Sequence, residues 1–202
     1  MSEILVLVDK AQDTVRNVTY EVLAAALKLK EKNGASISAV YIGDNAGSIE
    51  GDLGKYGADK VYKIENASLK DFNPSLYAHA LSELVNKIGA DIILGGNTLQ
   101  NQDFLPRVAS KTKGGLTTDA IDVDLTSSST LQVKRYKYSG KSIATLSYHD
   151  VKPMIATIRL NAYKPVEAGA AGESVSESID IPADDNYKVI ETNIIPKERP
   201  EL

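Results

Sequence analysis

The part of the sequence with the clearest capacity for chemistry is a pair of glycines at the end of an apolar stretch. Residues 91–94 predict a buried strand, and Gly95-Gly96-Asn97-Thr98 leads from it into a helix. A glycine turn between a strand and a helix is a common phosphate-binding arrangement, because the free amides of the first helical turn attract anions. The candidate nucleotide site consists of Asp9, Gly95, Gly96 and Asn97, which follow two predicted strands.

The same segment also has a structural interpretation. It matches neither the phosphate loop that ends in Gly-Lys-Ser/Thr nor the Gly-x-Gly-x-x-Gly dinucleotide turn, and two glycines also suit any sharp turn. Pro106 fits an early helical position, so we expect the helix to begin near Leu105, with Asp103 at its start. A carboxylate there would compete with a phosphate for the same amides. Both interpretations of the turn remain open at this point.

A second cluster of polar residues consists of Asp119, Asp122 and Asp124. These carboxylates could bind a hard cation, but the alternation of residues 119–125 predicts a strand that explains them without one, and a calcium-loop pattern is missing. His79 falls in a predicted helix and His149 in a turn, and neither has metal-ligand spacing. The chain also lacks a Gly-x-Ser-x-Gly nucleophile motif. We therefore predict no catalytic residue and no metal site.

The composition is that of a folded globular protein. The chain has 202 residues, of which 43% are hydrophobic and 25% are charged, and it has no cysteine. The lack of cysteine excludes disulfides and thiolate metal sites and suggests a reducing compartment, which we take to be a bacterial cytoplasm. A net charge of −4 gives no general attraction to nucleic acid. We find no membrane segment or signal peptide, and the basic stretch 134–137 lies in a strand pattern.

The first half of the chain alternates strand and helix patterns with short connections. Asn17 and Asn73 are predicted helix N-caps, and glycines follow each helix. This alternation predicts an α/β fold with a parallel sheet and helices on both of its faces, and any ligand at the carboxyl edge. The predicted strands are 3–8, 36–42, 59–64 and 91–94, and the predicted helices are 17–33, 49–56 and 73–88.

The second half of the chain predicts further strands. Those at 119–125, 131–138, 142–148 and 153–160 are interpreted as hairpin strands added to the parallel sheet, with a tight turn at Ser139-Gly140. Residues 164–174 predict an exposed loop, and two final edge strands are expected at 176–181 and 187–195. Residues 196–202 have the composition of a linker.

An ordered set of segments resembles the alpha subunit of electron transfer flavoproteins. The set consists of Asp103-Phe-Leu-Pro-Arg-Val-Ala109, Gly115-Leu-Thr-Thr-Asp119, the Ser139-Gly140 hairpin and Ile155-Ala-Thr-Ile-Arg159, after an opening Ile4-Leu-Val-Leu-Val-Asp9. The resemblance covers nearly the whole chain but only the N-terminal domain of the family. It implies a nucleotide-binding (adenine nucleotide alpha hydrolase-like) fold in residues 1–195, with 196–202 as the linker to an FAD domain that would follow.

The resemblance also implies a function and partners. In the family, this domain pairs with a beta subunit that holds AMP, and the two support the FAD domain that accepts electrons from acyl-CoA or other dehydrogenases. No FAD-contacting residue of the family has a counterpart here. Arg107, Asp119 and Arg159 match recurrent positions, where they would form structural ion pairs or contact the partner.

The leading hypothesis is a scaffold domain for heterodimer assembly rather than an enzyme. One alternative is a stand-alone adenine-nucleotide-binding module of universal-stress type that uses Asp9 and the Gly95-Gly96 turn. A further alternative is a metal-dependent enzyme that uses the Asp119, Asp122 and Asp124 face.

Overall fold

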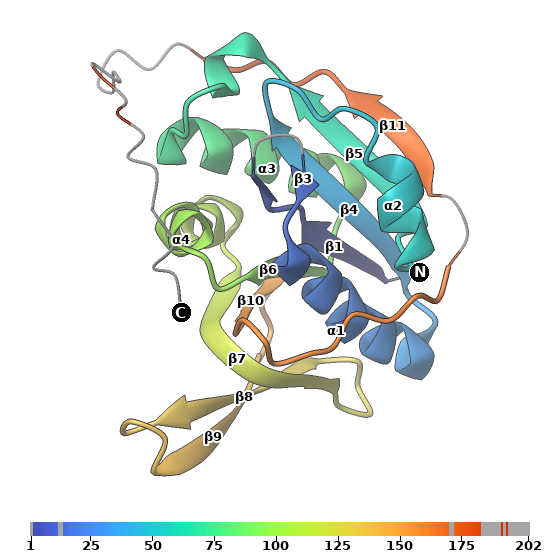
Figure 1. Cartoon of the computed structure of the whole chain (residues 1–202). Coiled ribbons are helices and arrows are strands. Elements are labelled where there is room, and N and C mark those ends of the chain that lie inside the picture. The colour runs from blue at the N-terminus through green and yellow to red at the C-terminus, as the bar shows by residue number, and fades with distance from the viewer. Residues whose placement is uncertain (1, 12–13, 170–171, 183–190, 192, 194–202) are drawn as a thin grey trace, which may run out of the picture.

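One large sheet forms the centre of the molecule (Figure 1). The computed structural model describes residues 2–11, 14–169, 172–182, 191 and 193. Within them, the sheet has the strand order β11-β5-β4-β1-β6-β10-β7-β8-β9, in which the strands from β11 to β7 run parallel and the last two run antiparallel. This confirms the predicted α/β class. The strands are Glu3–Leu7 (β1), Ser36–Gly43 (β4), Lys60–Glu65 (β5), Ile92–Gly96 (β6), Gly115–Leu125 (β7), Leu131–Lys137 (β8), Ser142–Ser147 (β9), Met154–Ile158 (β10) and Glu173–Glu177 (β11), with a separate pair of Lys10–Ala11 (β2) and Thr14–Val15 (β3).

Helices cover both faces of the sheet, as predicted. Successive side chains of a strand point to opposite faces of the sheet, so those of Ile4 and Leu5 lie on opposite faces of β1. Ile4 belongs to a buried cluster with residues of α1 and α2, whereas Leu5 belongs to one with residues of α3 and α4. The helices are Asn17–Asn33 (α1), Glu50–Lys55 (α2), Pro74–Ile88 (α3) and Leu99–Thr112 (α4), with a short 3-10 turn at Ala67–Leu69 (η1).

The helix ends follow the local sequence with one exception. Asn73 caps α3, since its side chain accepts hydrogen bonds from the amides of the second and third helical residues, and Gly89 ends the helix in the left-handed region at φ 67°. The prediction of Asn17 as an N-cap was wrong. Arg16 holds that position, and Asn17 lies inside the helix, where its amide donates to Glu21.

Helix α4 begins earlier than the sequence suggested. Thr98 is its N-cap, and the Thr98 hydroxyl oxygen accepts a hydrogen bond from the backbone amide of Asn101. The helix therefore starts at Leu99, six residues before Leu105. Pro106 therefore lies inside the helix, and Asp103 lies beyond the first turn. The prediction that Asp103 competes with a phosphate at the helix start was wrong, because it rested on Pro106 being an early residue.

Strand β10 belongs to the parallel sheet and not to a hairpin. It lies between β6 and β7 and runs parallel to both, with Met154 beside Ile92 and beside Gly115. All five of its residues are buried. A short strand buried throughout is typical of the interior of a parallel sheet, where both faces are covered. The prediction of a hairpin strand at 153–160 was therefore wrong, whereas β8 and β9 do form the predicted hairpin around Ser139-Gly140.

Strand β7 joins the parallel and antiparallel parts of the sheet. It begins at Gly115, earlier than predicted, pairs with β10 over its first half and pairs with β8 over its second half. The register with β8 shifts between Ala120 and Asp122. This irregularity brings Ala120 and Val123 into the same buried cluster, although simple alternation would place them on opposite faces.

The end of the described chain adds one parallel edge strand. β11 pairs with β5 and includes residues that were predicted as loop, so the loop predicted at 164–174 extends too far. Of the strand predicted at 176–181, only residues 176 and 177 lie in β11. Most of the strand predicted at 187–195, and the linker predicted at 196–202, lie outside the described residues, so the boundary at 195 stays a prediction.

Lysines of α1 fasten the helix to β7. The ammonium of Lys28 lies 2.5 Å from Asp122 Oδ1, and Lys32 pairs with Asp124. Asp122 also accepts from Lys134 of β8 at 3.2 Å and from the Tyr163 hydroxyl at 2.8 Å. Burial alone would raise the pKa of Asp122, but the hydrogen bonds from these three donors outweigh it and lower the pKa.

This network predicts a loss of stability in acid. A carboxylate with a lowered pKa stabilises the fold above its unfolded pKa of about 4, and the contribution disappears as the pH falls through the folded pKa. We expect Asp122→Asn to lower the free energy of unfolding by about 1 kcal/mol at pH 7 and by much less near pH 3. Urea titrations at several pH values measure both, with the exposed Asp150→Asn as control. A deficit of equal size at every pH would contradict this assignment.

Candidate functional site

The carboxyl edge of the parallel sheet brings together the residues expected there. Asp9 follows β1, Gly43 ends β4 and Gly95-Gly96 end β6, and these strands are neighbours in the sheet (Figure 1). Helix α4 begins directly beyond Gly96, so its N-terminus points at this edge. The backbone arrangement of a nucleotide site is therefore present at this edge. The side chains there decide which ligand could bind.

The Asp9 carboxylate lies at the N-terminus of α4 and is 6% exposed. Its Oδ1 accepts a hydrogen bond from the Thr98 hydroxyl at 3.0 Å, and its Oδ2 accepts one from the side-chain amide of Asn101 at 3.1 Å. Burial raises the pKa of Asp9, and the two hydrogen bonds oppose that rise. Asp9 therefore joins the end of β1 to the start of α4 through two side chains of that helix start.

The two glycines are required by close packing around this carboxylate. A Cβ on Gly96 would lie 2.5 Å from Val18 Cγ2 and 3.3 Å from Asp9 Oδ2. A Cβ on Gly95 would lie 2.9 Å from Leu7 Cδ1 and 3.2 Å from the Asn101 amide nitrogen. No side chain larger than hydrogen fits these positions without movement of a neighbour, so the glycines have a structural reason that is independent of any ligand.

Asn97 turns away from Asp9 and joins a different polar cluster. Its amide nitrogen donates to Asp119 Oδ1 at 3.2 Å, and its amide oxygen accepts from the Thr157 hydroxyl at 2.9 Å. Asp119 has a positive φ of 61°, and its backbone amide donates to the Thr157 hydroxyl oxygen. Arg159 Nε lies 3.8 Å from Asp119 Oδ1. Of the four candidate nucleotide residues, the structure therefore brings together Asp9, Gly95 and Gly96 but not Asn97.

The three charged residues that were proposed as interface or structural positions occupy two separate places. Arg107 pairs with Asp103 one turn earlier on α4, with both side chains about half exposed. An exposed pair of this kind contributes little to stability. Arg159 directly follows β10 and Asp119 lies inside β7, and the Arg159 guanidinium lies 5.3 Å from the ring centroid of Tyr136 on the hairpin.

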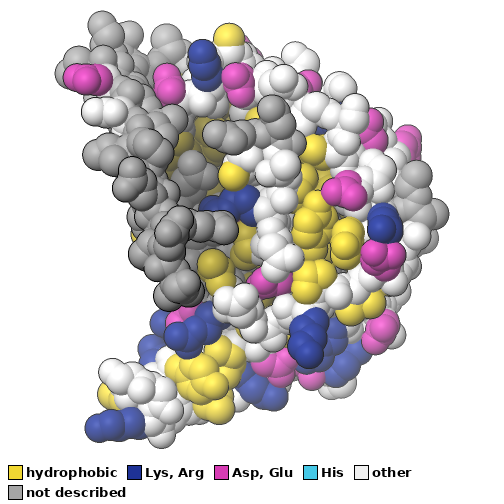
Figure 2. All heavy atoms as spheres, in the orientation of Figure 1, with side chains coloured by type: hydrophobic (Ala, Val, Ile, Leu, Met, Phe, Trp, Pro, Cys, Tyr) yellow, Lys and Arg dark blue, Asp and Glu magenta, His cyan; other side chains and the backbone are white. Residues whose placement is uncertain are grey.

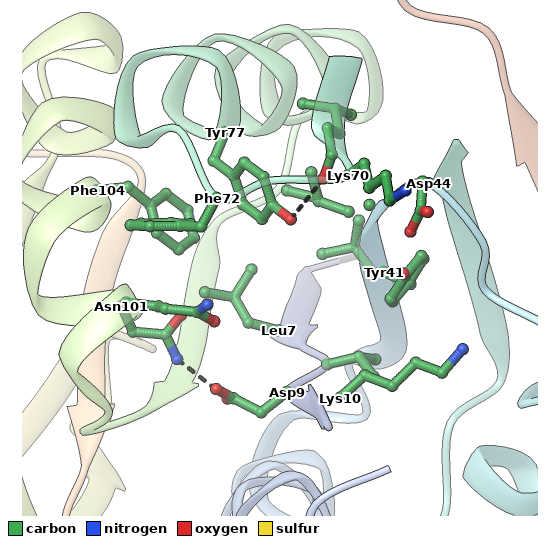
Figure 3. Close-up of a pocket in the computed structure, with 16 residues that line it drawn as sticks. Leu7, Asp9, Lys10, Tyr41, Asp44, Lys70, Phe72, Tyr77, Asn101 and Phe104 are labelled. Atoms are coloured by element: carbon green, nitrogen blue, oxygen red, sulfur yellow. Dashed lines mark hydrogen bonds between the residues drawn. The ribbon is translucent and has the colours of Figure 1, made fainter. Parts of the chain in front are cut away.

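A pocket of about 310 Å³ opens beside Asp9, between the ends of β1 and β4 and the start of α3 and α4 (Figure 3). Its lining includes Asp9 and Gly43 but not Gly95, Gly96 or Asn97. Sequence reasoning missed its aromatic wall, Phe72, Tyr77 and Phe104, because these residues come from separate segments and their spacing gives no sign that they meet. The nearest signal was Gly43, which marks the sheet edge.

The carboxylates of β7 and the two histidines have ordinary structural surroundings. Asp122 and Asp124 are paired with lysines, and among the described residues no group of three or more His, Asp or Glu side chains could hold a metal ion. His79 Nε2 lies 3.0 Å from the Asp180 carbonyl oxygen, and His149 is exposed after β9. In the part of the chain that the structure describes, no helix is both long and apolar enough to cross a bilayer.

The mostly parallel sheet with helices on both faces defines an α/β protein with a fold of nucleotide-binding type. The sequence model of the family described as the electron transfer flavoprotein domain matches residues 4–184. The chain belongs to this family.

Curated relatives carry the names of whole subunits. The alpha subunit of electron transfer flavoprotein from Thermoanaerobacterium thermosaccharolyticum is 33% identical over 162 residues, which cover 80% of this chain and 49% of the relative. The alpha subunit from Bacillus subtilis is 33% identical over 190 residues, covering 94% of this chain and 57% of the relative. The LctC subunit of the NAD(+),ferredoxin lactate dehydrogenase of Acetobacterium woodii is 29% identical over 164 residues, which cover 81% of this chain and 39% of the relative. The chain thus spans about half the length of these relatives.

The carboxyl edge does not fit the flavin dinucleotide that the family name implies. The pocket volume of about 310 Å³ is at the lower end for ligand sites, which suits a single ring system rather than a dinucleotide. The buried Asp9 carboxylate in the pocket lining would also repel a diphosphate. We therefore assign no flavin contact to these residues.

The Asp9 hydrogen bonds predict a large cost for their removal. Asp9→Ala leaves the Thr98 hydroxyl and the Asn101 amide without their buried acceptor, so we expect the free energy of unfolding to fall by about 3 kcal/mol. The matched control is Asp103→Ala, whose exposed pair should change it by no more than about 0.5 kcal/mol. Chemical denaturation of both variants provides the test, and equal effects would show that Asp9 is not a structural clamp.

The packing at Gly96 gives a second prediction. Gly96→Ala forces a methyl group against Val18, and we expect a loss of about 1–3 kcal/mol in the free energy of unfolding. Gly51→Ala in α2 is the control, because a Cβ there meets no atom within 4 Å, and a gain of up to about 1 kcal/mol is expected. Thermal and urea unfolding compare the two. A neutral Gly96→Ala would contradict the close packing assigned between Gly96 and Val18.

Proposed function

We propose that this chain is the N-terminal scaffold domain of an electron transfer flavoprotein alpha subunit. It pairs with a beta subunit that carries AMP, and the two together support the domain that binds FAD. The complex carries electrons from acyl-CoA or other dehydrogenases in a bacterial cytoplasm, and this part of it acts as a carrier scaffold rather than an enzyme. The observation that carries the proposal is the family match over residues 4–184 together with relatives named as alpha subunits.

The β8–β9 hairpin offers the surface that best suits a protein partner. It extends from the edge of the sheet (Figure 1), and hydrophobic side chains gather over it between lysine and arginine side chains (Figure 2). Tyr136 is 40% exposed and its direct cross-strand neighbour Ile143 is 57% exposed. Directly opposite residues share one face of a hairpin, so these two side chains form a continuous apolar contact.

Charged side chains surround this apolar pair. Arg159 lies over the Tyr136 ring and reaches Asp119, which holds the hairpin base against the end of the parallel sheet. Arg135 and Lys137 flank Tyr136 on β8, and Lys134 is paired with Asp122. An aromatic and aliphatic centre with arginine beside it and a charged rim is typical of protein interfaces. We expect the partner to present an acidic rim around an apolar patch.

Substitution in the hairpin provides the test of this pairing. The chain and the beta subunit encoded with it are mixed at micromolar concentration, and a stable heterodimer is expected by size-exclusion chromatography and calorimetry. A Tyr136→Asp, Ile143→Asp double variant should weaken the association at least about tenfold, because it buries two charges in an apolar contact.

The control for this experiment is Val166→Asp, an exposed apolar residue outside the hairpin. It should leave the affinity unchanged within about twofold. Absence of any complex between the unmodified chain and the beta subunit would contradict the proposed function. A complex that tolerates the double variant would leave the function standing but place the interface elsewhere.

A further inference from the structure

The pocket beside Asp9 has a shape suited to a flat ring. Phe72, Tyr77 and Phe104 form one wall, with ring centroids 5.0–6.3 Å apart and planes tilted by 65–71°. The floor is apolar and is formed by Leu7, Val40, Ile42 and Leu69. Figure 3 shows Tyr41 across the cavity from this aromatic wall. Edge-to-face aromatic walls over an aliphatic floor favour the burial of another planar ring.

The polar end of the pocket offers hydrogen-bond acceptors. Asn101 uses both hydrogens of its amide nitrogen, one for Asp9 Oδ2 at 3.1 Å and one for the Gly96 carbonyl oxygen at 2.9 Å. These bonds fix the orientation of the amide and leave its oxygen as the group that Asn101 presents to a ligand. Figure 3 shows Asn101 between Asp9 and the aromatic wall. A ring that binds here would therefore need N–H donors on its edge.

The charges around the pocket disfavour a phosphate. The Asp9 carboxylate stands at the polar end and would repel a second anion in this buried surrounding. The Lys10 ammonium donates to the carbonyl oxygens of Asn45 and Ala46 at 2.8 and 3.1 Å, which directs it away from Asp9 (Figure 3). At the mouth, Lys70 and Asp44 lie next to each other with opposite charges (Figure 3).

We infer that this pocket binds a neutral, planar heteroaromatic ring with N–H donors, of the nucleobase or nucleoside class and without a phosphate. The ring packs between Tyr41 and the Phe72, Tyr77 and Phe104 wall, and its N–H groups donate to the Asn101 amide oxygen. The site goes beyond the proposed scaffold role, because it gives this domain a small ligand of its own.

The test is a titration of the full 202-residue chain with adenosine, followed by calorimetry and by NMR of the aromatic side chains. AMP should bind no more tightly than adenosine, because its phosphate lies at the end of the nucleoside away from Asn101 and reaches the mouth, where Lys70 and Asp44 have opposite charges. Purine riboside, which lacks the exocyclic amine, should bind about threefold or more weakly, because it lacks those N–H donors. No binding of adenosine up to about 5 mM, or AMP binding at least about tenfold tighter than adenosine, overturns the inference.

Two variants locate the binding. Gln100 is exposed on α4 and lines the pocket, so Gln100→Trp should fill the opening and weaken adenosine at least about tenfold. The control is Lys111→Trp, exposed on the same helix and outside the pocket, which should stay within about twofold. If Gln100→Trp unfolds the chain, Lys70→Trp at the mouth blocks the same opening.

Unchanged adenosine affinity in the folded blocking variant overturns the assignment of the pocket. The same follows if the blocking variant weakens binding of the beta subunit while adenosine does not bind, because the pocket then takes a side chain of the partner. Failure of adenosine binding leaves heterodimer formation unaffected, so the two proposals fail separately.

Discussion

The carboxyl edge of this protein depends on the buried carboxylate of Asp9. Its two oxygens accept from Thr98 and Asn101, which lie about ninety residues further along the chain at the start of α4. Its backbone amide and carbonyl are both bonded to the Thr19 hydroxyl of α1. A charge in a buried place must be satisfied by hydrogen bonds. One residue therefore sets the position of the first strand and of the helices on either side of the sheet.

This carboxylate also decides what the sheet edge can bind. It accepts hydrogen bonds from two side chains at the start of α4, and Gly95 and Gly96 give the backbone the close approach that this arrangement needs. The open space lies on the other side of Asp9, against aromatic residues of α3 and α4.

The antiparallel end of the sheet, formed by β7, β8 and β9, is held by charged side chains. β7 leaves the parallel sheet through an irregular register near Ala120 and continues as the base of the β8–β9 hairpin. Lysines of α1 hold its carboxylates, and Arg159 links its Asp119 to Tyr136. The exposed apolar pair on the hairpin is therefore carried by a rigid base, at a part of the sheet distinct from the pocket, so contacts at one need not disturb the other.

The sequence by itself determined the alternation of strands and helices, the glycine and asparagine ends of α3 and the hairpin at Ser139-Gly140, because these depend on short-range periodicity and turn chemistry. It also carried the ordered segments typical of the family. The tertiary structure alone decided the place of β10, since a neighbour in the chain need not be a neighbour in a sheet. It also decided the role of Asp9 and the meeting of Phe72 with Phe104. Hydrogen bonds and ring contacts between distant segments leave no periodic trace in the sequence, so only the folded chain shows that the glycine turn is closed by its own carboxylate.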